Sequence, residues 1–167
     1  MTIITLKVDG RSEEILRRYI EENGFEGKNE FHSTLIYTEE VPIFRRGRLE
    51  IELKGRLPLE LDSSTYSFDI FGSGNLVLKY ENEEIESMRR LLRLEAIRQS
   101  MVEWPDLEED EFDILRSHVL FRRSKVYDMV PHITLAKSCD GNLEDLPDFT
   151  ASLTFSDFNW YHQQITA

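Results

Sequence analysis

The sequence predicts a single α+β domain in which two pseudo-symmetric strand–helix–strand lobes surround a central cleft. Short runs of β-branched and aromatic residues alternate with two segments of helical periodicity, and the strand–helix–strand order occurs twice. A chain of 167 residues, 40% of them hydrophobic, has the length and composition of one globular domain. We expect the lobes over roughly 1–72 and 73–167, with an insertion at about 104–130.

The expected strands are segments in which β-branched and aromatic residues concentrate or alternate with polar ones. They are 3–8, 31–38, 48–56, 65–71, 75–80, 130–136 and 149–161. In 48–56, Leu49, Ile51 and Leu53 alternate with charged residues, which predicts a strand with one buried face. Gly72 favours a tight link between the strands on either side of it.

Two segments have the three- and four-residue apolar spacing of helices. Ser12 is placed to cap the first helix, which we expect to end near Asn23 because an Asn-Gly pair tolerates the left-handed conformation. The second helix is expected from Glu83 to about Val102. Residues 104–130 begin with a helix-breaking Trp-Pro pair and are expected to be irregular or partly helical.

The charge balance disfavours several classes of partner. The formal net charge is -12, whereas proteins that hold long nucleic acid carry a basic surface. A small nucleotide in a local pocket remains compatible with this charge. No run of roughly 20 apolar residues is present, and the N-terminus has no basic start followed by an apolar run, so we expect no membrane partner and a cytoplasmic location. The single Cys139 excludes a disulfide framework and a multi-cysteine metal site.

Two of the four histidines occur in the same local pattern, HSTL and HITL. Because alternate residues of a strand share a face, His32 is expected beside Thr34, and His132 beside Thr134. Two such strands at one cleft would present two imidazoles and two hydroxyls. A neutral imidazole can accept a proton while a protonated one donates, and threonine hydroxyls can bind phosphate oxygens. The pair therefore indicates phosphoryl chemistry.

Two other interpretations of the histidines compete with this one. A single motif of this kind is more often a strand whose histidine is hydrogen-bonded within the fold. A metal site is disfavoured because neither motif carries a carboxylate at ligand spacing. We therefore expect neither a metal nor another cofactor.

The segments FHSTLIYT and PHITLAK resemble the paired signature of the two-histidine phosphoesterase superfamily. The resemblance implies a bilobal α+β fold and metal-independent action on 2′,3′-cyclic or 3′–5′ phosphodiesters. The short acidic chain, with FHSTL-x-Y early and VPHITL late, is more narrowly similar to phage anti-CBASS phosphodiesterases, which degrade cyclic di- and trinucleotide signals of bacterial immunity such as cGAMP.

This resemblance implies that His32 and His132 are the catalytic acid/base pair and that Thr34 and Thr134 bind phosphate. The implied substrate is a small cyclic oligonucleotide, met in the host cytoplasm if the protein is viral. One alternative is an enzyme that opens RNA 2′,3′-cyclic phosphates or cleaves 2′–5′ bonds. Another is a non-catalytic sponge that only binds cyclic nucleotides.

Four further side chains bear on substrate binding. Trp160 is expected to continue a polar strand face, where it either stacks on a base or closes the edge of the core. Lys7 and Lys79 occupy equivalent positions of the internal repeat, where they either reach phosphate or, as is more common at strand ends, point into solvent. Lys137 follows the second motif, and simple alternation predicts that it points away from His132.

Overall fold

The computed structural model describes residues 2–38, 46–72, 74–103, 130–137, 139 and 141–162. Its helices and strands are β1 (Thr2–Val8), α1 (Gly10–Glu22), β2 (His32–Thr38), α2 (Arg46–Gly55), β3 (Leu59–Glu60), β4 (Ser67–Phe71), β5 (Asn75–Lys79), α3 (Glu83–Glu103), β6 (His132–Ala136) and β7 (Thr154–His162). This mixture confirms the predicted α+β class. The expected irregular segment 104–130 lies, apart from its last residue, outside the described residues.

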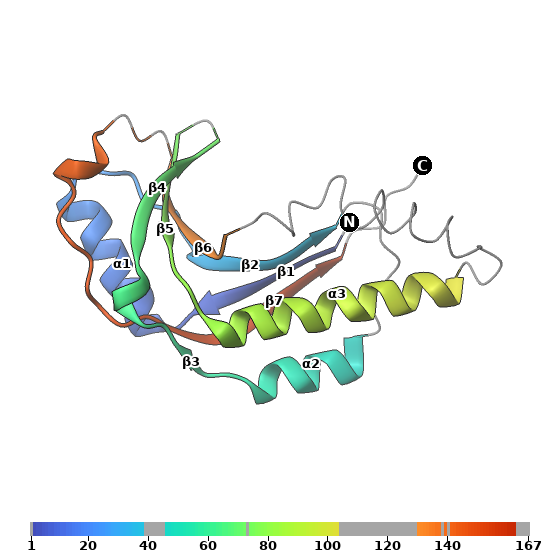
Figure 1. The fold of residues 1–167 in the computed structure, drawn as a ribbon. Helices are drawn as coiled ribbons and strands as arrows, with labels where there is room; N and C mark the ends of the chain where they lie inside the picture. The colour runs from blue at the N-terminus through green and yellow to red at the C-terminus, as the bar shows by residue number, and fades with distance from the viewer. Residues whose placement is uncertain are drawn as a thin grey trace.

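The described strands form one seven-stranded sheet in the order β3-β7-β1-β2-β6-β5-β4. Every neighbouring pair is antiparallel. The strand β7 lies beside β1, and β4 lies beside β5 (Figure 1). The β2–β6 junction therefore separates one half of the sheet, with β3, β7, β1 and β2, from the other, with β6, β5 and β4. This division does not coincide with the lobe boundary expected at residue 72.

The units β1–α1–β2 and β5–α3–β6 pair their strands in the same way. Lys7 is the partner of His32 in one unit, and Lys79 is the partner of His132 in the other. In both units the register then shifts at the leucine of the histidine motif, which has no partner of its own. Each motif therefore contains a β-bulge at the same position.

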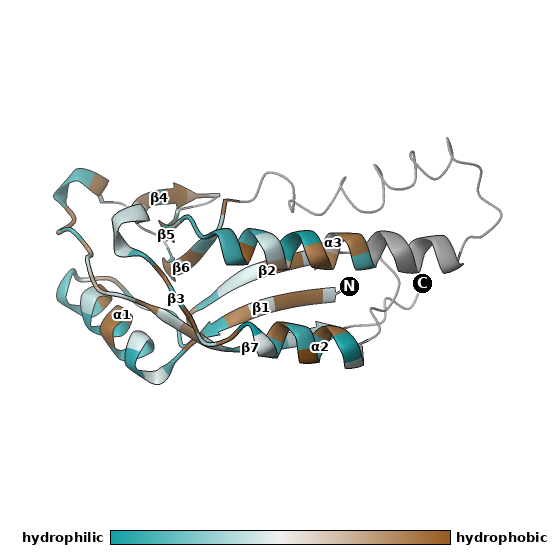
Figure 2. Ribbon diagram, turned by 60° about the horizontal axis from the view of Figure 1, so that its bottom comes forward, coloured by the Kyte–Doolittle hydropathy of each residue, from teal (hydrophilic) through white to brown (hydrophobic). Residues whose placement is uncertain are grey.

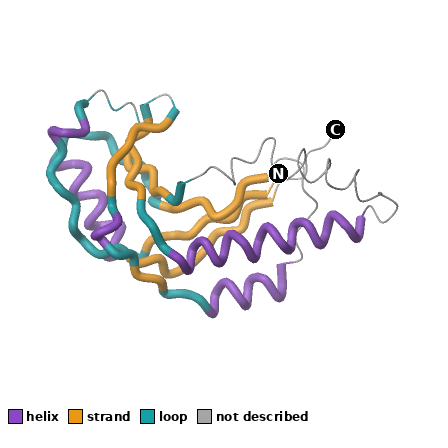
Figure 3. The backbone as a smooth tube through the Cα atoms, viewed as in Figure 1, coloured by secondary structure: helices purple, strands orange, loops and turns teal. Residues whose placement is uncertain are grey.

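The core lies between one face of the sheet and the helices. Figures 1 and 3 show α2 and α3 running alongside β1, β2 and β7, whereas α1 lies at the end formed by β4, β5 and β6. Figure 2 shows the hydropathy of each described residue along the ribbon. Apolar residues of the strands and helices form one buried cluster in this layer. Its fully buried members include Ile4, Leu6, Leu16, Ile20, Leu35, Leu53, Met88, Leu92, Ile133 and Leu135. Among the described helices, none is both long enough and apolar enough to cross a membrane.

The strand expected at 48–56 is wrong, because the structure has the helix α2 there. Leu49 and Leu53 are buried, but Ile51 is 75% exposed. Residues four positions apart share a face on a helix and also on a strand, so the two leucines fit both patterns. Only Ile51 separates the two cases, and its exposure is that of the outer side of a helix.

The N-terminal end of α1 also differs from expectation. Asp9, rather than Ser12, is the cap, and its carboxylate accepts a 2.8 Å hydrogen bond from the Ser12 backbone amide. The Ser12 hydroxyl instead accepts from the Thr154 amide, also at 2.8 Å, and so ties α1 to the first residue of β7. The helix ends at Asn23 as predicted.

Candidate active site

The two motif strands meet at the centre of the sheet. Ser33 of β2 pairs with Ile133 of β6 in an antiparallel bridge, and both side chains are buried in the core. Antiparallel pairing then places His32 across from Thr134, and Thr34 across from His132, on the opposite face of the sheet. All four of these sequence-predicted site residues thus come together on one face.

Each histidine is the diagonal neighbour of the other in this arrangement. Diagonal positions on an antiparallel pair are about 7–8 Å apart, so side chains as long as histidine can reach the same small group from both positions. The two rings are electrostatically coupled, since the charge of His132 contributes to lowering the pKa of His32. Both histidines and both threonines are half-buried.

The orientation of His132 is set by two contacts. Its Nδ1 lies 2.8 Å from the carbonyl oxygen of Val130. A carbonyl oxygen only accepts, so Nδ1 carries a proton in this contact and Nε2 is left for proton exchange with a ligand. The Phe71 ring packs edge-on against the imidazole, with 4.8 Å between ring centroids and 75° between ring planes.

The surroundings lower the pKa of both imidazoles. For His32 the largest cause is burial, followed by the positive charge of Lys28, and Glu30 opposes the shift. For His132 burial is again the largest cause, the Val130 carbonyl opposes it, and the charges of Arg89 and Lys28 add to it. The neutral, proton-accepting form of each ring is therefore favoured. A bound phosphodiester anion would favour the protonated form again.

Lys28 lies near both histidines and Lys137 lies near Lys28, although the sequence patterns did not place either there. Lys28 is in the loop between α1 and β2, and its charge reaches both imidazoles. The bulge at the second motif pairs Ala136 with Leu76, which belongs to the core face. Lys137, the next residue, is thereby returned to the face of His132, contrary to the expectation from simple alternation. No local sequence feature marks this bulge.

Lys7 and Lys79 also lie on the histidine face, because each is paired with a motif histidine. The ammonium of Lys79 is 3.0 Å from Oδ2 of Asp69, a residue of the neighbouring strand. This ion pair uses a charge that could otherwise reach a phosphate.

Tyr80 holds the two motif strands in position from the core side. Its hydroxyl shares a 2.5 Å hydrogen bond with the Ser33 hydroxyl, in the middle of the first motif. Its backbone amide donates to the Pro131 carbonyl, one residue before the second motif, at 3.1 Å. Burial raises the pKa of the Tyr80 phenol, so it remains a neutral hydrogen-bonding group. Both motifs are thus fixed by a single buried residue.

The structure does not bring Trp160 to the histidines. Trp160 is paired with Ile4 and packs partly buried against the core, on the side of the sheet opposite His32. The expected polar face is interrupted because β7 has a bulge at Ser156, where the register with β1 shifts. Of the two alternatives, this position agrees with a ring that closes the edge of the core.

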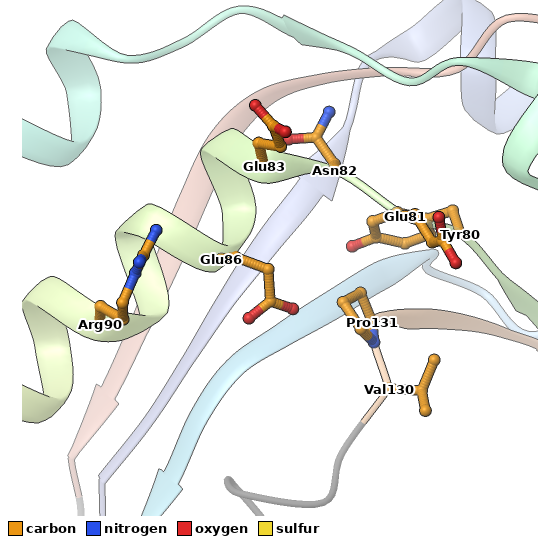
Figure 4. Close-up of a pocket in the computed structure, with 8 residues that line it drawn as sticks. All are labelled: Tyr80, Glu81, Asn82, Glu83, Glu86, Arg90, Val130 and Pro131. Atoms are coloured by element: carbon orange, nitrogen blue, oxygen red, sulfur yellow. The ribbon is translucent and has the colours of Figure 1, made fainter.

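A pocket of about 590 Å³ lies beside the start of α3 (Figure 4). It is lined by Tyr80, Glu81, Asn82, Glu83, Glu86, Arg90, Val130 and Pro131. Three carboxylates and one guanidinium make this lining unfavourable for a phosphate anion. Within the described ranges, no group of three or more His, Cys, Asp or Glu side chains is placed to hold a metal ion.

In comparisons with known proteins, no family model and no curated protein sequence matched this chain.

Proposed function

We propose that this chain is a metal-independent phosphodiesterase that cleaves 3′–5′ bonds of small cyclic oligonucleotides of the kind used as immune signals. The observation that carries the proposal is the square formed by His32, Thr134, Thr34 and His132 on the face of the sheet opposite the core. A site with two coupled imidazoles, each across a strand pair from a hydroxyl, suits acid/base catalysis at one phosphorus atom.

The proposed bilobal two-histidine phosphoesterase fold is supported by the equal registers of the two β–α–β units. Each unit has a lysine across from its histidine and a bulge at the same motif leucine. A pseudo-twofold axis between β2 and β6 would relate the units, and it would exchange His32 with His132. The two histidines would then approach one phosphate from opposite sides.

In the proposed reaction, one neutral imidazole removes the proton of a ribose 2′-hydroxyl, and the 2′-oxygen attacks the adjacent phosphorus. The bond from phosphorus to the 5′-oxygen breaks, and the protonated second imidazole gives its proton to that oxygen. The threonine hydroxyls donate hydrogen bonds to the non-bridging oxygens as negative charge builds up. The product carries a 2′,3′-cyclic phosphate, which water can open in a second step.

The test is incubation of the protein with a panel of cyclic di- and trinucleotides in excess EDTA. We expect linear products, and His32→Ala and His132→Ala should each reduce the rate by a factor on the order of 10²–10⁴. His118→Ala, in a histidine outside both motifs, is the matched control and should retain activity. Circular dichroism should show that all three variants fold.

The same panel separates the alternatives. If the protein opens only the 2′,3′-cyclic phosphates at RNA ends, its substrate is RNA and not a cyclic oligonucleotide. A ligand-dependent rise in melting temperature without any cleavage would indicate a binding protein instead of an enzyme. An analogue without the 2′-hydroxyl should bind but resist cleavage, and its rapid turnover would overturn the internal attack.

A further inference from the structure

A pocket of about 810 Å³, here called the loop pocket, lies between the α1–β2 loop and the end of β6. It is lined by Glu26, Gly27, Lys28, Asn29, Glu30 and Lys137. Both segments that line it are close in sequence to a histidine motif, since Lys28 precedes His32 by four residues and Lys137 follows Thr134 by three. The pocket therefore adjoins the His32–Thr134 side of the candidate active site.

The fold holds the two lysines of this pocket together. Gly27 and Ala136 form an isolated antiparallel bridge, and each lysine is the residue that follows one of these partners. The loop also comes close to α1, because a Cβ atom on Gly27 would lie 3.3 Å from Cγ2 of Ile20. The backbone positions of Lys28 and Lys137 are thus held near each other by strand pairing and packing.

The charges in this pocket favour an anion that also carries hydrogen-bond donors. Within the described part of the chain, neither Lys28 nor Lys137 forms an ion pair or a hydrogen bond with another side chain. Burial and the neighbouring charge of Lys137 lower the pKa of Lys28. A bound anion would stabilise the protonated form of Lys28 and so oppose this shift. Glu26 and Glu30 can accept hydrogen bonds from nucleobase amino groups.

We propose that the loop pocket is a second phosphate subsite, in which Lys28 and Lys137 bind the phosphodiester next to the one being cleaved. This inference rests on the proposed function, and it narrows the substrate class to nucleotides with at least two backbone phosphates. A mononucleoside 2′,3′-cyclic phosphate or a dinucleoside monophosphate would occupy only the histidine site.

The experiment compares two substrates, a cyclic dinucleotide with two phosphates and a dinucleoside monophosphate with one. Lys137→Gln should raise KM for the cyclic dinucleotide about tenfold, because a hydrogen bond between charged groups is lost. Its kcat/KM for the one-phosphate substrate should stay within about twofold of the unaltered protein. Lys54→Gln on α2 makes the same change in net charge outside the pocket and should affect neither substrate.

A binding measurement keeps the subsite separable from catalysis. Calorimetry with a cyclic dinucleotide that lacks 2′-hydroxyls should show about tenfold weaker binding by Lys137→Gln, while Lys137→Arg should restore most of the affinity. If the protein cleaves nothing but binding still depends on Lys137, the proposed function fails and the subsite stands. If it cleaves cyclic dinucleotides and Lys137→Gln changes neither KM nor binding, the subsite is overturned.

Discussion

Burial and neighbouring cations decide the protonation state of the two motif histidines. General acid/base catalysis needs one imidazole neutral and the other protonated. Burial and Lys28 lower the pKa of His32 against the opposing charge of Glu30, and burial, Arg89 and Lys28 lower that of His132. As pH rises, the general acid therefore loses its proton at a pH below the usual histidine pKa of about 6.5.

We accordingly predict that kcat/KM for a cyclic dinucleotide depends on pH in a bell-shaped curve. The midpoint of its alkaline limb should lie below about pH 6.5. Lys28→Gln should move this limb to higher pH, because removing a positive charge makes protonation of both imidazoles easier. Lys54→Gln should leave the limb in place. Rate measurements from pH 4 to pH 9, roughly the range in which imidazole and carboxylate groups titrate, provide the test. An alkaline limb that stays fixed in Lys28→Gln would contradict the role given to this charge.

At the scale of elements, the helix α2 gives a direct test of how its apolar residues are used. Leu53 is fully buried, whereas Ile51, two positions earlier, is mostly exposed. Leu53→Ala should therefore lower the free energy of unfolding by about 2–5 kcal/mol, and Ile51→Ala should change it by no more than about 0.5 kcal/mol. Urea unfolding followed by circular dichroism measures both. Equal losses from the two variants would fit the alternating strand and not the helix.

The positions of most strands and of α1 and α3 could be predicted because their apolar residues follow one period only. The segment of α2 could not, since Leu49 and Leu53 satisfy both periods and nothing local identifies Ile51 as exposed. Its helical form depends on the sheet that the leucines pack against, which is assembled from distant parts of the chain.

The candidate site shows the same limit at finer resolution. His32, Thr34, His132 and Thr134 could be placed together because the alternation between strand faces holds within each short motif. Lys137 and Trp160 were misplaced because a β-bulge comes between each of them and the residues from which their direction was extrapolated. A bulge arises from pairing with a neighbouring strand, so alternation along one strand does not reveal it.

For the whole molecule, the net charge of -12 and an anionic substrate are compatible because charges act locally. At physiological ionic strength, interactions between exposed charges are largely screened beyond about 8 Å. The potential at the histidine face therefore depends mainly on nearby groups, and these include Lys28 and Arg89. The acidic remainder of the surface would disfavour a long polyanion, which extends beyond this local region.

The two halves of the sheet should unfold as one unit, although a single bridge pair joins β2 to β6. One continuous core cluster spans both halves and the three helices of the described residues. The Tyr80 ring, next to β5, lies 6.0 Å from that of Phe155 in β7, between ring centroids. Disrupting either half would expose apolar surface of the other, and this makes a partly folded state unfavourable.

We predict that urea unfolding of a Trp104→Phe variant gives the same midpoint and the same m-value by two probes. The chain has two tryptophans, so fluorescence of this variant reports on Trp160 in β7, next to β1, while far-ultraviolet circular dichroism reports on all helices. Adding Phe155→Leu, which loosens the contact between the halves, should lower both midpoints together. A fluorescence transition at clearly lower urea than the circular dichroism transition would show that the β7–β1 half unfolds separately, and the shared core would then not couple the two halves.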